Sequence, residues 1–152
     1  MTDQASNQQQ FAIQKIYIKD VSLESPNSPA IFQEGQWQPE VNVQINTVAK
    51  SAADNLHEVV LTITVTAKQN GKTAFLVEVK QAGLFLLSGF PTEQLGGMLG
   101  AYCPEVLFPF AREAISELVS KGGFPQLLLA PVNFNALYTQ HQQQAPQAGV
   151  AH

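Results

Sequence analysis

Two strongly alternating segments joined by an Asn-Gly turn constrain the fold of this chain more than any other feature. Successive side chains of Glu58–Ala67 would point to alternate faces of a strand, and β-branched residues occur on both faces, as is typical of β-strands. The dipeptide Asn70-Gly71 follows and suits the positive φ angles of a tight turn. Thr73–Leu87 then alternates again. The segments predict a long antiparallel hairpin.

Two further strands are predicted upstream of this hairpin. They cover Phe11–Glu24 and Glu40–Val48. Because side chains repeat every second residue along a strand, Asp20 and Glu24 are expected on one face. The long intervening loop, residues 25–39, contains three prolines and a glycine, which exclude regular structure. Four strands with local connections predict an antiparallel sheet, and hence an α+β fold.

Proline and aromatic residues concentrate in the C-terminal half of the chain. Gly100–Glu113 and Gly122–Phe134 together contain five aromatic rings and four prolines. Proline removes a backbone donor and disfavours a continuous helix. We therefore expect short rigid pieces that present an apolar surface, which suggests binding of apolar partners rather than catalysis.

Helices are expected around these pieces. Pro91 begins a helix that is interrupted near Gly96-Gly97 and kinked by Pro104 and Pro109. Asn133 is expected to cap a short last helix that ends near Gln143, and both helices are expected on one side of the sheet.

The chain has few charges for its size. Charged residues make up 13% of the 152 residues, against about 25% in an average protein. A surface this poor in charge favours self-association, although abundant Gln and Asn could instead keep a monomer polar. The net charge of −4 argues against nucleic acid as a partner.

The sequence predicts one domain between two tails. Residues 1–10 and 141–152 are amide-rich and have little to bury, so both are expected to be mobile, with the domain at residues 11–140. Cys103 is the single cysteine and excludes an internal disulfide. No secretory signal and no apolar run of about 18 residues occurs. A soluble cytoplasmic protein without membrane insertion is expected.

No arrangement of residues points to catalysis. Cys103 lies in an apolar context, and the histidines at 57, 141 and 152 show no spacing that would place a base beside it. No metal-ligand spacing and no phosphate-binding loop occurs. We therefore expect no enzyme activity, no metal and no cofactor.

Long segments of the chain resemble the SecB family of bacterial export chaperones. The resemblance extends from about Phe11 to Tyr138. It is carried by Ile16-Tyr-Ile-Lys-Asp20, Glu24-Ser-Pro-Asn-Ser-Pro-Ala-Ile-Phe32, Trp37-Gln-Pro-Glu40, Glu58-Val-Val-Leu61, Thr73-Ala-Phe-Leu-Val-Glu78, Leu99-Gly-Ala-Tyr-Cys-Pro104, Leu107-Phe-Pro-Phe-Ala-Arg-Glu113 and Phe124-Pro-Gln-Leu-Leu-Leu-Ala-Pro-Val-Asn-Phe134.

The resemblance implies an ATP-independent homotetrameric chaperone, a dimer of dimers. It would bind unfolded precursor proteins, keep them competent for translocation and deliver them to the SecA motor. The implied SecA-binding residues are Asp20, Glu24, Leu76 and Glu78. The implied client groove contains Ile31, Phe32, Trp37, Tyr102, Phe108, Phe110, Phe134, Leu137 and Tyr138. The expected oligomer interface contains Val77, Val79, Gln81, Ile115 and Leu118.

Three alternatives remain open at this point. A SecB-like chaperone of a toxin–antitoxin pair would prefer one antitoxin segment. A small-ligand-binding domain would line a closed pocket with the same aromatic residues. An enzyme that uses Cys103 would lose its activity in Cys103→Ser.

Overall fold

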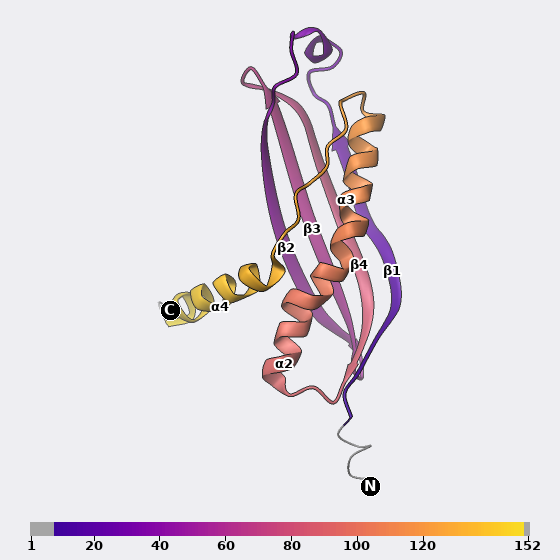
Figure 1. The fold of residues 1–152 in the computed structure, drawn as a ribbon, viewed down its shortest axis with the longest axis vertical. Helices are drawn as coiled ribbons and strands as arrows, with labels where there is room; N and C mark the ends of the chain where they lie inside the picture. Colours follow the sequence, from indigo (N-terminus) through magenta and orange to yellow (C-terminus); the bar gives the residue numbers. More distant parts are fainter. Residues whose placement is uncertain (1–7, 151–152) are drawn as a thin grey trace.

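Four long antiparallel strands form one sheet in the computed structural model, which describes residues 8–150 (Figure 1). The strands are β1 (Gln10–Glu24), β2 (Glu40–Ala53), β3 (Leu56–Gln69) and β4 (Lys72–Ser88). Their order across the sheet is β1-β4-β3-β2, so β1 and β2 are its edges. The expected antiparallel sheet is confirmed, and β2 extends five residues beyond its predicted end.

The predicted turn joins β3 to β4. Asn70 and Gly71 have φ angles of 53° and 79°, the left-handed values that a tight hairpin turn of this kind requires. A second hairpin joins β2 to β3 at Asn55, whose φ is 58°. The Asn55 carbonyl accepts a hydrogen bond from the Leu87 N–H at 2.8 Å, which fastens this turn to β4.

Two irregularities in β1 change which side chains share a face. The pairing with β4 shifts between Ile13 and Lys15 and again between Ile18 and Asp20. Each extra residue of a β-bulge reverses the alternation along its strand. Strict alternation, which puts Tyr17 and Ile13 on one face, is therefore wrong across the bulges. The buried Gln81 side chain donates from Nε2 to the Tyr17 carbonyl at 3.1 Å, beside the second shift.

A helical segment follows β4 and covers one face of the sheet (Figure 1). It consists of α2 (Thr92–Gly97), the π-helical turn η2 (Met98–Tyr102) and α3 (Cys103–Lys121). The prediction that proline divides Gly100–Glu113 into short pieces is wrong, because α3 continues through Pro109. Pro104 directly follows the π-helical turn η2, where the hydrogen-bonding pattern of the helical segment changes. Pro109 lies on the exposed side, where carbonyl groups can turn towards water.

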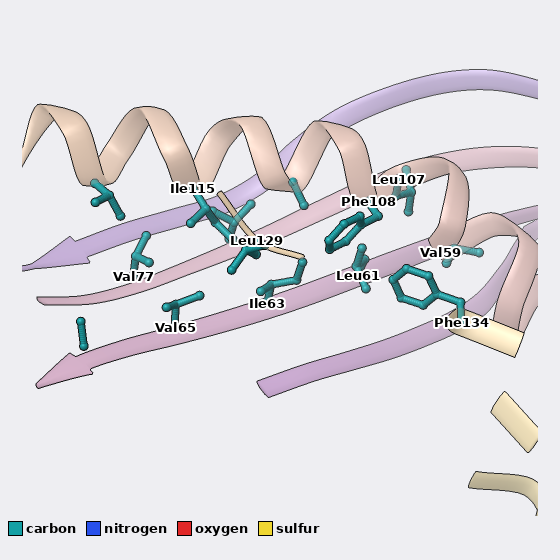
Figure 2. Close-up of a cluster of buried hydrophobic side chains, with 14 of the residues drawn as sticks. Val59, Leu61, Ile63, Val65, Val77, Leu107, Phe108, Ile115, Leu129 and Phe134 are labelled. Atoms are coloured by element: carbon teal, nitrogen blue, oxygen red, sulfur yellow. The ribbon is translucent and has the colours of Figure 1, made fainter. Parts of the chain in front are cut away.

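The core lies between α3 and the sheet (Figure 2). Alternate side chains of β3 and β4 point to the helix and are fully buried, and α3 covers them with its apolar stripe. Each such aliphatic side chain contributes roughly 1.5–3 kcal/mol by leaving water. The largest fully buried side chains of this core, aliphatic and aromatic together, include those of Val59, Leu61, Ile63, Val65, Val77, Val79, Phe75, Phe85, Leu107, Ile115 and Val119.

The last helix does not pack on the sheet as expected. The chain returns along the sheet from Gly122 to Asn133, and α4 (Phe134–Val150) then contacts η2 and points away from the sheet (Figure 1). The predicted cap is confirmed, since the Asn133 Oδ1 accepts the Ala136 N–H at 3.0 Å. The helix continues past Gln143 into residues 141–150, which were expected to form a tail. Of the expected N-terminal tail, residues 1–7 lie outside the described residues, as do residues 151–152. No helix within residues 8–150 is long and apolar enough to cross a membrane.

Candidate functional site

Four aromatic rings gather where the loop after β1 meets the end of α3. Trp37 packs on Phe75 of β4 and on Phe124 at centroid distances of 6.5 and 5.6 Å. Phe124 also contacts Phe75 at 5.0 Å and Phe32 at 5.1 Å. Phe75 and Phe124 are buried, whereas 49% of Phe32 is exposed. This aromatic cluster therefore has a buried base and an exposed rim, and Ile31 beside it is buried.

A second apolar site lies at the other end of the same face. A hollow of about 540 Å³ is bounded by β2, η2 and α4. Tyr138 lies in a notch formed by two glycines, because a Cβ atom at Gly100 or Gly96 would collide with its ring or hydroxyl. The exposed Leu137 lines the hollow beside Tyr138. Glycine thus lets α4 approach η2 closely.

An apolar stripe on β2 lies between the aromatic cluster and the hollow. Val41, Val43 and Ile45 pair with the buried Ala67, Val65 and Ile63 of β3, so they point to the helix-covered face. Val41 and Val43 are 42% and 40% exposed. The Gly122–Asn133 segment runs over the same face, and its Leu128 is 68% exposed. We call the cluster, this stripe and the hollow together the apolar groove.

The expected groove residues do not all lie in the apolar groove. Phe108 and Phe134 are buried and pack on each other at 5.6 Å, with the Arg112 guanidinium over the Phe108 ring. They support the groove from the core instead of lining its surface. Tyr102 is exposed, but it packs on Phe11 at 5.1 Å, beside β1. Phe110 is 48% exposed on α3.

Sequence reasoning missed two surface contributors to the groove. Val41 and Val43 lie in the predicted strand Glu40–Val48, but the alternation of that strand does not show that their side chains stay exposed. The sequence does not show that β2 is an edge strand of the sheet. The same alternation of apolar residues in a central strand yields buried side chains.

The four expected acidic-face residues lie together. Glu24 pairs with Leu76, and Ser22 pairs with Glu78, while Asp20 pairs with the next outward residue of β4, Lys80. Since Val77 and Val79 point into the core, Leu76 and Glu78 point to the opposite, open face. Glu78 also accepts a hydrogen bond from the Thr64 hydroxyl at 2.8 Å. Three carboxylates and one apolar side chain therefore share the open face.

A buried carboxylate elsewhere on the open face was not foreseen. Glu58 is 7% exposed and accepts hydrogen bonds from the Tyr17 hydroxyl and from Lys19 Nζ, the latter at 2.9 Å. These two hydrogen bonds lower the pKa of Glu58. Burial, together with the Glu58 charge, raises the pKa of Tyr17 to about 12. Tyr17 and Lys19 are 41 and 39 positions away from Glu58 in the sequence, so no local pattern could have revealed this cluster.

Most of the expected oligomer-interface residues lie inside this chain. Val77, Val79 and Ile115 have no exposed surface, and 3% of Gln81 is exposed. Their side chains are therefore unavailable to another copy, and only Leu118 is partly exposed. Val77, Val79 and Gln81 alternate along β4 on the face that α3 covers, and Ile115 lies on the side of α3 that packs on the sheet. Other apolar side chains remain exposed along the edge strand β1: Ile13, Ile18 and Val21.

Cys103 lies in the core. Its side chain is fully buried, and burial raises the pKa of its thiol to about 12. A thiol with such a pKa is a poor nucleophile. In the part of the chain that the structure describes, no group of three or more His, Cys, Asp or Glu residues could hold a metal ion.

The chain matches known proteins over nearly its full length. The family model for the preprotein translocase subunit SecB matches residues 4–145. The protein-export protein SecB of Nitrosococcus oceani is 61% identical, with 99% of this chain and 92% of the relative covered. The protein of the same name from Thioalkalivibrio sulfidiphilus is 62% identical, with 92% and 84% covered.

A solved structure has a similar fold. It is a SecB-like chaperone of Mycobacterium tuberculosis, in complex with a peptide from an antitoxin, and it aligns with a TM-score of 0.66 at 15% identity. The alignment covers 80% of this chain and 90% of that one. Together, the family match and the identity over most of both chains show that this chain belongs to the SecB family of protein-export chaperones.

Proposed function

We propose that this protein binds unfolded precursor proteins in the cytoplasm, keeps them competent for translocation and delivers them to the SecA motor. The apolar groove carries this proposal. Its exposed valines on β2 join an aromatic cluster at one end to a 540 Å³ hollow at the other. An unfolded chain exposes apolar side chains in no fixed order, and an elongated apolar surface accepts many such orders.

Two physical properties of the groove suit an extended client. Each client side chain buried there would contribute roughly 1.5–3 kcal/mol. Within residues 8–150, no strand pairs with the outer side of the edge strand β2, so a client segment can add to it as a strand. Main-chain hydrogen bonds do not depend on the client's sequence, which favours a chaperone over a binder of one small ligand. We assign the protein no catalytic activity.

We propose that the open face of the sheet binds SecA. Asp20, Glu24 and Glu78 supply negative charge around the apolar Leu76, which favours a partner segment with basic and apolar residues. Glu24 is exposed at the end of β1, and Glu113 is exposed on α3, which covers the other face of the sheet. Glu24→Lys should weaken SecA binding, whereas the matched variant Glu113→Lys should not. Equal weakening would contradict this assignment.

We also propose that the protein assembles as a dimer of dimers, with β1 at a contact between copies. Ile18 and Ile13 are 50% and 45% exposed on this edge strand. An edge strand with apolar side chains readily pairs with another copy. Burial of these side chains would account for a surface with so few charges.

The proposed client binding is tested by light scattering with a slow-folding precursor that has been reductively unfolded. We expect a mass near four chains that takes up the unfolded precursor but not its folded form. Val43→Asp places a charge in the groove, and Val48→Asp places the same charge on the opposite face of the same strand. Only Val43→Asp should weaken binding. A monomer that ignores the unfolded precursor would contradict the proposal, and preference for a single antitoxin segment would favour a toxin–antitoxin chaperone instead.

A further inference from the structure

A buried glutamine amide at the end of β3 contacts the loop that carries Trp37. Gln69 is 3% exposed, although its neighbours Lys68 and Asn70 are exposed. Its Nε2 donates a hydrogen bond to the Gln36 carbonyl at 2.6 Å. Its Oε1 accepts a hydrogen bond from the Gln38 N–H at 3.0 Å. One side chain thus satisfies a backbone acceptor and a backbone donor at once.

These two hydrogen bonds enclose Trp37 in the sequence. The carbonyl of the preceding residue and the N–H of the following residue are both fixed by the Gln69 amide. The loop at this point belongs to no strand or helix, so its backbone has no sheet ladder to hold it. The amide supplies the two hydrogen bonds that a neighbouring strand would otherwise supply.

The position of Trp37 in turn determines the shape of the aromatic cluster. Its ring lies nearly parallel to Phe75, with an interplanar angle of 24°, and also packs on Phe124. The exposed Phe32 contacts the same Phe124 ring. A displaced Trp37 would therefore expose Phe75 and Phe124 and change the surface that a client meets.

Three further contacts of this loop with the β3–β4 hairpin are exposed, one of which is the hydrogen bond from Asn27 Nδ2 to the Thr73 carbonyl at 2.9 Å. Lys72 Nζ lies 3.5 Å from the Glu34 carboxylate, and Asn70 Nδ2 lies 3.5 Å from the Glu34 carbonyl. Exposed ion pairs are screened by water and contribute little. The buried hydrogen bonds are different, because a buried polar group that loses its partner is not compensated by water. Gln69 is thus the stronger attachment of the loop.

We propose that Gln69 is a positioning residue of the client groove, which holds Trp37 in the orientation that an unfolded segment binds. This inference rests on the proposed client binding. A groove that is ordered in advance loses less conformational freedom when a client binds. Release of the Trp37 side chain should weaken client binding about 2- to 10-fold, the factor that corresponds to immobilising one side chain.

The single tryptophan of the chain makes this testable without a label. Gln69→Met has a similar length and removes both hydrogen bonds. We expect its Trp37 emission to shift to longer wavelength, its quenching by acrylamide to increase, and its affinity for a reductively unfolded precursor to fall by the factor given above. The control is Lys72→Met, which removes only the exposed ion pair with Glu34 and should leave all three readouts unchanged.

Gln69→Glu provides a rescue that a general loss of stability would not show. Its ionised carboxylate accepts from the Gln38 N–H but cannot donate to the Gln36 carbonyl. Protonation restores a donor at that place, so acidification should return Trp37 emission towards that of the wild type. The wild type measured over the same pH range controls for other titrating groups. This variant also replaces Gln69→Met if the latter does not fold, as judged by circular dichroism.

The outcomes separate the two proposals. Wild-type protein that does not bind the unfolded precursor contradicts the proposed function, while Trp37 emission still reports on the loop. Wild type and Gln69→Met that bind equally well contradict the role of Gln69, whether or not the emission changes. Reduced affinity in Gln69→Met, a shifted emission and recovery of Gln69→Glu at acidic pH together support it.

Discussion

The glycine notch beneath Tyr138 predicts how firmly α4 is held. A Cβ atom at Gly100 would collide with the Tyr138 ring, whereas a Cβ atom at Gly97 would meet nothing within 4 Å. Both glycines are in the same helical segment, α2 and η2. Gly97→Ala is therefore a matched control for Gly100→Ala, with the same change in side chain and no collision.

The expected change in the free energy that holds α4 against η2 in Gly100→Ala follows from three terms. Alanine in place of glycine stabilises a helix by about 1 kcal/mol. If the ring stayed in its notch, the added methyl group would cost about 1–3 kcal/mol through overpacking. If the ring left, half of a tyrosine side chain, about 100 Å², would return to water at a cost of about 2.5 kcal/mol. In the second case the net loss is about 1.5 kcal/mol, which is about tenfold in the opening equilibrium of α4.

Hydrogen exchange of the backbone amides from Tyr138 to His141 measures this opening. In Gly100→Ala we expect these amides to exchange about tenfold faster, since opening and exchange share one equilibrium. The sheet should remain protected, because the change is well below a typical unfolding free energy of about 5–15 kcal/mol. Gly97→Ala should exchange no faster than wild type. Equal exchange in both variants would refute the notch as the attachment of α4.

Three further predictions concern the core and the buried carboxylate. The folded state lowers the pKa of Glu58 below its ordinary value of 4.5, so the ionised carboxylate stabilises the fold above that pH, and this stability is lost as the pH falls through the lowered pKa. The free energy of urea unfolding should therefore differ less between about pH 7 and about pH 3 in Glu58→Gln than in the wild type. An identical difference in both proteins would contradict this. Cys103→Ala should leave client affinity unchanged and lower the unfolding free energy by about 1 kcal/mol. The folded wild-type thiol should react with a thiol reagent only on unfolding, and rapid reaction would argue against its burial. A Cβ atom at Gly83 would lie 2.7 Å from the Phe85 ring and 3.1 Å from Leu107. Gly83→Ala should therefore cost about 1–3 kcal/mol in urea unfolding, and an unchanged midpoint would show that α3 can move away.

The sheet could be predicted because its signals are local. The period of two in Glu58–Ala67 and the Asn70-Gly71 turn each depend on a few neighbouring residues, and the structure has both. Proline is also a local signal, yet it misled, because its cost depends on where it lies in a helix and on which side faces water. Pro104 lies at the start of α3 and Pro109 on its exposed side.

The site was less predictable because it depends on which segments meet. Aromatic composition indicated an apolar surface, but only the packing of α3 determined that Phe108 and Phe134 are buried while Val41 and Val43 remain exposed. Strand parity, which is local, puts Asp20 on one face with Glu24, whereas the register of β1 with β4 decides that Leu76 and Glu78 lie on that same face of the sheet.

By itself, the sequence determined the strands, their hairpin turn, the cap of α4 and the resemblance to SecB, all of which rest on short-range patterns or on long segments of unusual composition. Only the tertiary structure decided that β2 is an edge, that Tyr138 lies over Gly100, and that Gln69 reaches the backbone on both sides of Trp37 from 31 and 33 residues away. Contacts of this range depend on how the whole chain folds, since no local spacing specifies which distant backbone group a buried amide will meet.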